Sequence, residues 1–196
     1  MSFDGSAERF RTSDGGPADS VALLRHEPAD PLSNSRFSQV HLFCVKLRSM
    51  TSNWQDNLVS DADAIRELLS QTKSIAVLGI KTEAQFDQPA FYVPKYMQNA
   101  GFKIIPVPVY YPDVTEILGE KVYRQLQEIP GEVDMVNIFR RPHDIPPHLD
   151  DLLRKKPKSV WLQLGISHER AAEQLAREGV KVVQDRCLMV DHRRFS

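Results

Sequence analysis

Residues 73–82 read KSIAVLGIKT, an apolar run that ends on a glycine and passes into a polar segment. Such a run is typical of a buried parallel strand, and ligands of open α/β sheets bind where these strands end and the next helix begins. The stretch therefore predicts a first strand followed by a phosphate-binding loop.

This loop departs from the glycine pattern of dinucleotide-binding proteins. That pattern has glycines at three fixed offsets, whereas this chain has Lys81 and Ala84 where the second and third would stand. Gly79 permits a tight turn, and Lys81 and Thr82 add a cation and a hydroxyl near a helix N-terminus, which attracts phosphate. Taken alone, Gly79 is equally compatible with an ordinary turn and Lys81 with a solvated side chain. The loop indicates phosphate binding and argues against a typical NAD site.

The composition is that of an ordinary globular protein. The chain has 196 residues, 41% hydrophobic and 26% charged, which suffices for one domain with an appendage. A formal net charge of -1 leaves no basic excess for nucleic acid, and no stretch approaches the roughly 18 apolar residues of a membrane span. Cys44 and Cys187 form no CxxC pair or disulfide framework, which favours a reducing compartment. We expect a soluble, cytoplasmic protein without nucleic-acid or membrane partners.

The chain divides near residue 58. Residues 1–58 hold three of the nine glycines and three prolines without a sustained helical or strand period, so we expect a flexible N-terminal extension there. Within it, residues 40–47 are apolar enough for a strand or a short docking segment, but an apolar stretch in a loose tail is equally compatible. Residues 59–196 form the expected folded domain.

Helices and strands alternate from residue 60 onwards. The expected strands are 74–78, 103–107, 133–139, 159–164 and 180–183. Helices are expected to begin at a capping box of Ser60 and Asp63, at Pro89, at Tyr123, at Pro146 and after Ser167, while 115–119 is a helical turn or a loop. This alternation predicts a Rossmann-like, doubly wound parallel sheet of about five strands in the order 3-2-1-4-5, with helices on both faces.

The carboxyl ends of these strands share one edge of the sheet, where we expect the site. Arg140 and Arg141 follow the third strand and could bind phosphate through bidentate guanidinium bonds. Alternatively, one of them pairs with a nearby aspartate (Asp134, Asp144 or Asp185). Gln163, after the fourth strand, either faces the ligand edge or contacts a neighbouring backbone.

Candidates for catalysis are few in this sequence. Cys187 follows Asp185 and Arg186 and is either a reactive thiol or a buried structural one. His143 is either a base or a polar loop residue. The chain contains no HExxH, GxSxG or Walker lysine motif and no metal-ligand cluster, so we assign no catalytic or metal-binding residue and favour a binding role over an enzyme.

Seven segments together resemble a known family. They are 75–79 (IAVLG), 104–107 (IIPV), 117–123 (ILGEKVY), 133–134 (VD), 139–142 (FRRP), 161–165 (WLQLG) and 182–187 (VVQDRC). In order and spacing across residues 60–192, they resemble the stand-alone CoA-binding proteins, which are similar to the Rossmann-type domain at the N-terminus of the succinyl-CoA synthetase alpha subunit.

The resemblance implies a coenzyme A or acyl-CoA site across the sheet edge. By position, Gly79, Ile80, Lys81 and Thr82 would hold phosphate, Pro106 and Val107 would border the nucleoside, and Phe139, Arg140 and Arg141 would close the other side, with Gly165 joining from the loop after the fourth strand. Two positions depart from the family: Lys81 replaces a small hydroxyl residue, and Pro108 replaces an asparagine.

These observations favour a binding module for a CoA-type ligand that acts as a carrier, sensor or regulatory module, as a homo-oligomer or beside a partner enzyme subunit. The alternative is an enzyme acting on a CoA thioester or nucleotide through Cys187, His143 or Asp185. A third hypothesis is redox chemistry in which Cys187 forms a mixed disulfide with CoA.

Overall fold

The computed structural model describes residues 53–196. Most of the expected extension, including the apolar stretch at 40–47, lies outside the described residues.

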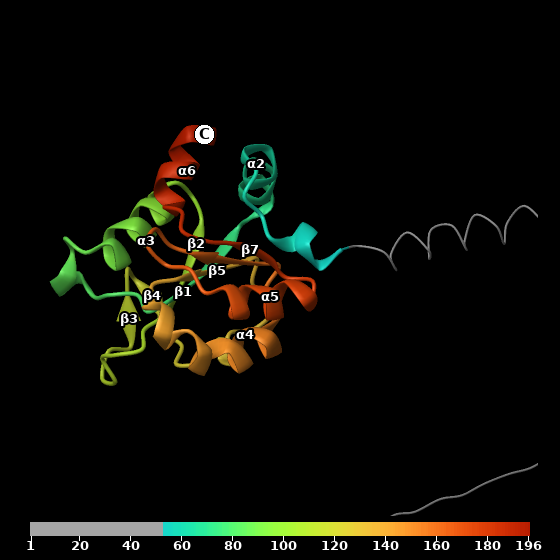
Figure 1. Ribbon diagram of the computed structural model, residues 1–196. Coiled ribbons are helices and arrows are strands. Elements are labelled where there is room, and N and C mark those ends of the chain that lie inside the picture. The colour runs from blue at the N-terminus through green and yellow to red at the C-terminus, as the bar shows by residue number, and fades with distance from the viewer. Residues whose placement is uncertain (1–52) are drawn as a thin grey trace, which may run out of the picture. The chain divides into compact units, whose positions relative to one another are not determined.

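Five parallel strands form the central sheet (Figure 1). They are β1 (Ser74–Leu78), β2 (Lys103–Val107), β5 (Met135–Ile138), β6 (Ser159–Leu162) and β7 (Lys181–Val183). Their order is β2-β1-β5-β6-β7, which confirms a Rossmann-like α/β fold. A separate antiparallel hairpin of β3 (Glu116–Ile117) and β4 (Glu120–Lys121) occupies the region where we expected a helical turn or a loop.

The predicted strand order 3-2-1-4-5 is wrong. β5, the third strand of this sheet in chain order, pairs with β1 and leaves β2 at the edge. Pro106 of β2 gives the physical reason, because proline has no N–H for a sheet hydrogen bond. Val107 O accepts from Gly79 N at 2.8 Å on the β1 side, whereas Pro106 O accepts from Tyr123 N at 2.9 Å on the outer side. A further strand on that side would lack a donor at Pro106.

Helices cover both faces of the sheet (Figure 1). One face carries α2 (Ala62–Gln71), α3 (Pro89–Asn99) and α6 (Leu188–Phe195), and the other carries α4 (Leu149–Lys155) and α5 (Glu169–Arg177). Short 3-10 helices are η1 (Trp54–Asn57), η2 (Glu83–Gln85), η3 (Leu126–Glu128), η4 (Pro142–Asp144) and η5 (Pro146–His148). We did not expect α6, and Asp61, rather than the predicted Ser60, caps α2 by accepting from Asp63 N and Ala64 N.

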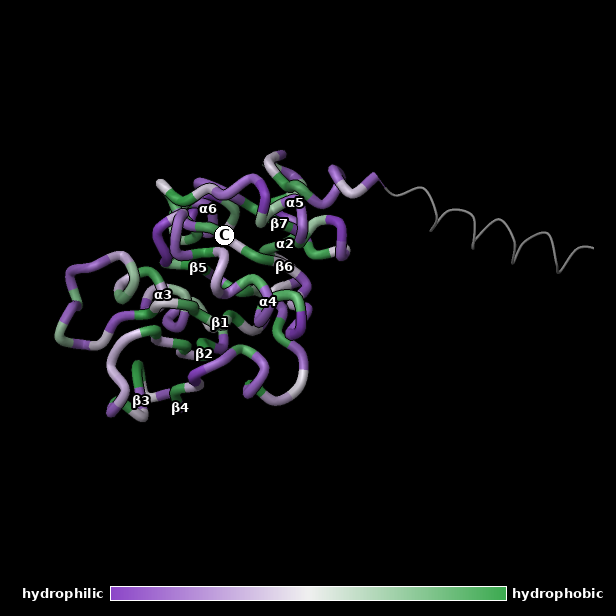
Figure 2. The backbone as a smooth tube through the Cα atoms, turned by 60° about the horizontal axis from the view of Figure 1, so that its bottom comes forward, coloured by the Kyte–Doolittle hydropathy of each residue, from purple (hydrophilic) through white to green (hydrophobic). Residues whose placement is uncertain are grey.

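Alternate residues of each strand point to opposite faces and build two apolar clusters. Val77 of β1 packs with Met97 and Trp161 on the α3 face, whereas Leu78 packs with Leu175 on the α5 face. The strands of the central sheet are accordingly largely hydrophobic (Figure 2). Because β1 is apolar on both faces, its residues form the centre of the fold.

Residues 53–59, mostly assigned to the extension, lie against α5 and β7. Asn57 Nδ2 donates to Ala176 O of α5 at 2.8 Å, and Leu58 forms a parallel bridge with Val182 of β7. Val59 N donates to Val182 O at 2.8 Å. The division of the chain at residue 59 stays a prediction.

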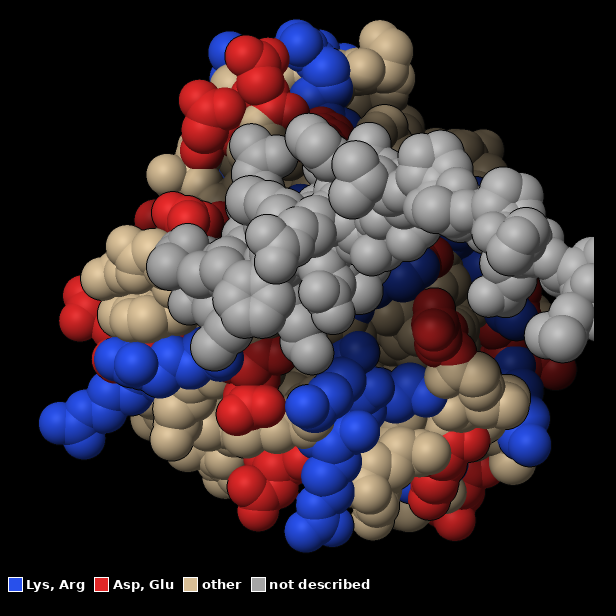
Figure 3. All heavy atoms as spheres, turned by 90° about the vertical axis from the view of Figure 1, so that its right-hand side faces the viewer, with Lys and Arg blue, Asp and Glu red and all other residues tan. Residues whose placement is uncertain are grey.

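Charges of both signs are interspersed on the face drawn in Figure 3. A mixed surface agrees with the formal net charge of -1. None of the helices within residues 53–196 is long and apolar enough to cross a membrane.

Candidate ligand-binding site

Gly79 is where the carboxyl ends of three strands meet. Its φ is +90°, and a Cβ atom at this position would lie 2.6 Å from Phe139 O and 3.2 Å from Arg140 Cδ. Gly79 N donates to Val107 O at 2.8 Å, and Phe139 N donates to Leu78 O at 2.9 Å. Only glycine fits this position, because any side chain would push β5 away from β1.

Lys81 extends from this turn toward two tyrosines. Its Nζ donates to Tyr111 Oη at 3.3 Å and lies 5.2 Å from the ring centre of Tyr110 and 5.5 Å from that of Tyr111. Among residues 53–196, no carboxylate forms an ion pair with Lys81. The ammonium group therefore contacts the two tyrosines and no carboxylate of these residues.

Arg140, which lies after the end of β5, also contacts Tyr110. Its Nη1 lies 3.4 Å from Tyr110 Oη, and its Nη2 lies 3.3 Å from Asp144 Oδ2. The hydrogen bond with Arg140, followed by the charge of that guanidinium, lowers the pKa of Tyr110. Arg140 Nε is buried without a hydrogen-bond partner. Of the three aspartates considered for pairing with Arg140 or Arg141, Asp144 is the one that pairs with Arg140.

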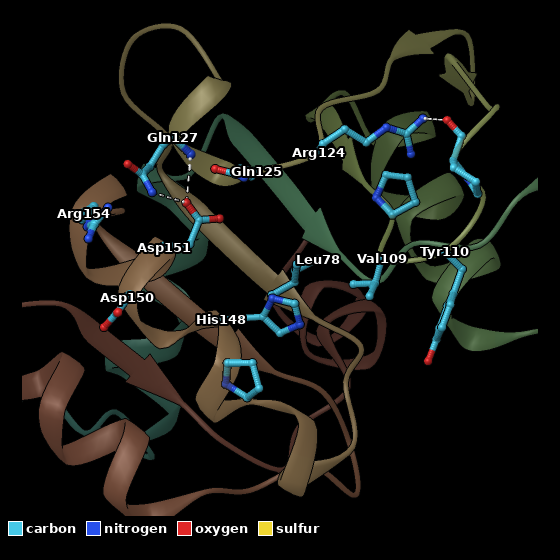
Figure 4. Close-up of a pocket in the computed structure, with 13 residues that line it drawn as sticks. Leu78, Val109, Tyr110, Arg124, Gln125, Gln127, His148, Asp150, Asp151 and Arg154 are labelled. Carbon is cyan, nitrogen blue, oxygen red and sulfur yellow. Dashed lines mark hydrogen bonds between the residues drawn. The ribbon is translucent and has the colours of Figure 1, made fainter.

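Two clefts flank the cluster formed by Lys81, Tyr110 and Arg140. Cleft A has a volume of about 740 Å³ and lies beyond the end of β2. It is lined by Leu78, Pro108, Val109, Tyr110, Pro112, Arg124, Gln125, Gln127, Pro147, His148, Asp150, Asp151 and Arg154. Figure 4 shows Tyr110 and Arg124 at one end of the cleft and Asp151, hydrogen bonded to Gln127, at the other. Burial and the charge of Arg140 lower the pKa of His148.

Cleft B, with a volume of about 440 Å³, lies between the start of α3 and the ends of β5 and β6. Its lining includes Pro89, Ala90, Tyr92 and Val93 of α3, Phe139 to Pro142 after β5, Gln163 to Ile166 after β6, and Cys187. Gln88, at the N-cap of α3, makes no side-chain capping bond. The positive end of this helix dipole therefore opens on cleft B beside Arg140.

The predicted residues are only partly brought together. Lys81 and Arg140 converge on Tyr110, and Arg140, Arg141, Phe139 and Gly165 all line cleft B. In contrast, the side chains of Ile80, Pro106 and Val107 are buried in the fold. Thr82 Oγ1 donates to Gln85 Oε1 at 2.8 Å. Whether these residues bind a ligand stays a prediction.

The three candidate participants in catalysis lie in different surroundings. Asp185 Oδ1 accepts from Gly165 N at 2.6 Å and so fixes the loop after β6. The side chain of His143 is 71% exposed and lies 3.6 Å from Asp144. Cys187 is half-buried, precedes α6 and lines cleft B. Of the three, Cys187 alone lines either cleft.

Sequence reasoning missed Tyr110, Tyr111 and Asn137. The two tyrosines directly follow the second strand and its unusual Pro108, which was the available signal. Asn137 is the one polar residue inside the apolar run of β5 and is fully buried. Gln163 contacts the Asn137 side chain at 3.0 Å, rather than a neighbouring backbone.

Comparisons with known proteins identify the family of this chain. The model of a family described as a CoA binding domain matches residues 73–193. The chain belongs to this family. The resemblance seen in the sequence segments is therefore confirmed, and it covers the whole sheet and both clefts.

Relatives of this CoA-binding-domain protein share most of its folded part. It is 38% identical to the uncharacterized protein YneT of Bacillus subtilis over 128 residues, which are 65% of this chain and 91% of YneT. The solved protein cell-free ID.343 from Thermus thermophilus is 37% identical with a TM-score of 0.64, and the match covers 70% of this chain and 100% of that one. A hypothetical protein from Pyrococcus horikoshii is 29% identical with a TM-score of 0.62, over 69% of this chain and 92% of its own.

Proposed function

We propose that this protein binds coenzyme A or an acyl-CoA at the carboxyl edge of its sheet and acts as a non-catalytic carrier, sensor or regulatory module. Family membership supports the ligand class. The observation that carries the site is the convergence of Lys81 and Arg140 on Tyr110, because Tyr110 lines cleft A and Arg140 lines cleft B.

The chemistry of CoA matches this layout. Its pyrophosphate is a dianion in the middle of the molecule, and Lys81, Arg140 and the N-terminus of α3 are the groups that would bind it. The adenosine would then extend into cleft A, where the exposed Tyr110 ring offers a stacking surface. The pantetheine arm would extend the other way, into cleft B.

Ligand titration tests the proposal directly. Calorimetry with CoA, acetyl-CoA, NAD and NADP should give binding for the CoA compounds and none for the dinucleotides. Native mass spectrometry of the purified protein should detect a copurifying mass near that of CoA. Tight binding of NAD with none of CoA would sink the proposal.

Lys81→Ala tests the site. Removing one charge-assisted contact should weaken CoA binding about tenfold, equivalent to about 1.4 kcal/mol. The matched control is Lys95→Ala, which removes an exposed α3 lysine bonded to Gln98 Oε1 at 3.1 Å and should leave the affinity unchanged. Equal affinities for the two variants would mean that the Lys81 side chain does not contact the ligand.

A second candidate function is an enzyme acting on a CoA thioester, because Cys187 lines the cleft proposed for the arm. Release of free CoA from acetyl-CoA by the wild type, and its loss in Cys187→Ala, would favour this candidate. Intact mass after oxidation in the presence of CoA would reveal the third hypothesis, a mixed disulfide at Cys187.

A further inference from the structure

Gln163, which lines cleft B, belongs to a buried amide pair with Asn137 that the proposed phosphate contacts do not use. Gln163 Nε2 donates to Asn137 Oδ1 at 3.0 Å, and the two residues are only 4% and 0% exposed. Asn137 belongs to β5, while Gln163 directly follows β6, the neighbouring strand. The pair is therefore fixed by the sheet itself.

Both amides retain unused hydrogen-bonding capacity. Asn137 Nδ2 is buried without a partner, and Gln163 Oε1 accepts no hydrogen bond from residues 53–196. Buried amide groups are normally satisfied, since an unpaired one loses its hydrogen bonds to water without replacement. Because Gln163 lines cleft B, its free oxygen is available to a molecule that enters the cleft.

The rest of the cleft decides what kind of group can reach this oxygen. Ala90, Val93, Phe139 and Ile166 give the walls an apolar character, and in such clefts a few polar groups fix the orientation of the ligand. A phosphate would repel the amide oxygen, and a plain hydrocarbon would leave it unpaired. An amide within an otherwise apolar chain can pack its apolar part against the walls and donate its N–H to the Gln163 oxygen.

We propose that Gln163, oriented by Asn137, hydrogen bonds an amide of the pantetheine arm and so makes the protein selective for arm-bearing ligands. This inference rests on the proposed function and assigns the arm to cleft B.

The experiment distinguishes binding of the pantetheine arm from binding of the nucleotide part of CoA. CoA and adenosine 3′,5′-bisphosphate, which lacks the arm, are titrated against wild type and Gln163→Met. The variant should bind CoA at least fivefold more weakly and bind the bisphosphate as the wild type does. Gln174→Met, an exposed glutamine on α5, is the matched control and should change neither affinity.

A second variant guards against a folding defect. Gln163→Met alone leaves both atoms of the Asn137 amide unpaired, whereas Asn137→Leu combined with Gln163→Met replaces both partners with apolar groups, which is often nearly neutral for stability. The double variant should fold and show the same selective loss of CoA affinity.

Three results would overturn the inference. If both variants keep wild-type affinity for CoA, Gln163 does not bind the pantetheine arm. The same conclusion follows if both variants lose affinity for CoA and for the bisphosphate equally. In either case the proposal that the protein binds CoA is unaffected. If the wild type binds neither compound, the proposed function fails and this inference fails with it.

Discussion

The two ends of the central sheet differ in how completely their polar side chains are hydrogen bonded. At the amino end, Asp134 accepts from Lys73 N and Ser74 N at 3.0 Å each, from Ser74 Oγ at 3.1 Å and from Lys158 Nζ at 2.7 Å. At the carboxyl end, Lys81 has no carboxylate partner within residues 53–196, and Arg140 Nε has no partner at all in that range. One end is saturated with hydrogen bonds, and the other is not.

Under the proposed function, this difference separates structural polar groups from the candidate ligand-binding ones. Saturated groups contribute to stability, because their hydrogen bonds are complete in the folded chain. Unsaturated groups next to a cleft gain partners only when a ligand arrives. Mutations at the amino end should therefore change stability and leave affinity alone, while mutations of unsaturated groups should do the reverse.

Gly79→Ala should have the largest effect. It should reduce both stability and affinity, because Gly79 lies between β1 and β5 and also next to Arg140. A Cβ 2.6 Å from Phe139 O forces β5 away from β1 and displaces Arg140. We expect a loss of about 2–4 kcal/mol in unfolding free energy, measured by chemical denaturation, and no detectable CoA binding.

Gly131→Ala is the matched control for Gly79→Ala. Gly131 also has a positive φ, +71°, but nothing lies within 4 Å of its added Cβ. It should lose only about 1 kcal/mol and keep full affinity. A Gly79→Ala variant as stable as this control would contradict the steric argument.

Asp134→Asn should affect stability alone. The lowered pKa of Asp134, about 2 instead of 3.8, arises although burial opposes it, because hydrogen bonds from Lys158, Ser74 and Lys73 favour the carboxylate. After allowance for solvent screening, we expect a loss of about 1 kcal/mol at neutral pH and unchanged CoA affinity. Asp63→Asn, which breaks an exposed pair with Arg66, should cost less than about 0.5 kcal/mol.

The pH dependence of this loss follows from the direction of the shift. A carboxylate whose pKa is lower in the folded state stabilises it fully above the unfolded value of 3.8, and this contribution disappears as the pH falls toward 2. The stability difference between wild type and Asp134→Asn should thus be constant above pH 3.8 and shrink below it. A difference that grows on acidification would exclude Asp134 as its source.

Asp144→Asn should strengthen binding slightly. Asp144 lies 3.3 Å from Arg140 Nη2 and competes with a phosphate for that guanidinium. Without the carboxylate, CoA should bind about two- to threefold more tightly in calorimetry at low salt. Glu173→Gln removes a carboxylate from another i,i+4 arginine pair, with Arg177, and should have no such effect. Weaker binding to Asp144→Asn would mean that Asp144 orients Arg140 for the ligand.

The smallest effect concerns Tyr110, whose pKa is lowered by the hydrogen bond and charge of Arg140. A bound phosphate neutralises Arg140, so the pKa of Tyr110 should rise when CoA binds. The measurement is the ultraviolet absorbance of tyrosinate during alkaline titration, with Tyr110→Phe as the reference. A further decrease on binding would place the phosphate elsewhere.

The fold class and the turn at Gly79 were predictable because they depend on local signals. The apolar run of β1 and the helix stop at Gly101 act within a few residues of their own positions. The strand order was not predictable from these local signals, because it depends on which strands pair, and Pro106 of β2 was the local sign of an edge. The α6 helix begins directly after the candidate residue Cys187, beyond the last predicted strand.

The site was only partly predictable, because its polar contacts join residues far apart in sequence. Lys81 contacts Tyr110 from another loop, and Asn137 contacts Gln163 from the neighbouring strand. Motif position predicts the backbone segments of the candidate site, but burial decides which side chains are accessible there, and the side chains of Ile80 and Val107 are buried. Side-chain direction depends on tertiary packing that no single segment encodes.

Both borders of the sheet are closed to further strands. At β2, Pro106 offers no N–H and its carbonyl is already used by Tyr123, while at β7 the carbonyl of Val182 is used by Val59. Exposed sheet edges are where separate molecules join by strand pairing, and proline or a covering segment prevents it. If copies of this protein or another subunit associate with residues 53–196, these two positions direct the contact to helices and loops. The sheet, and with it the spacing of the two clefts, would then be the same in every assembly.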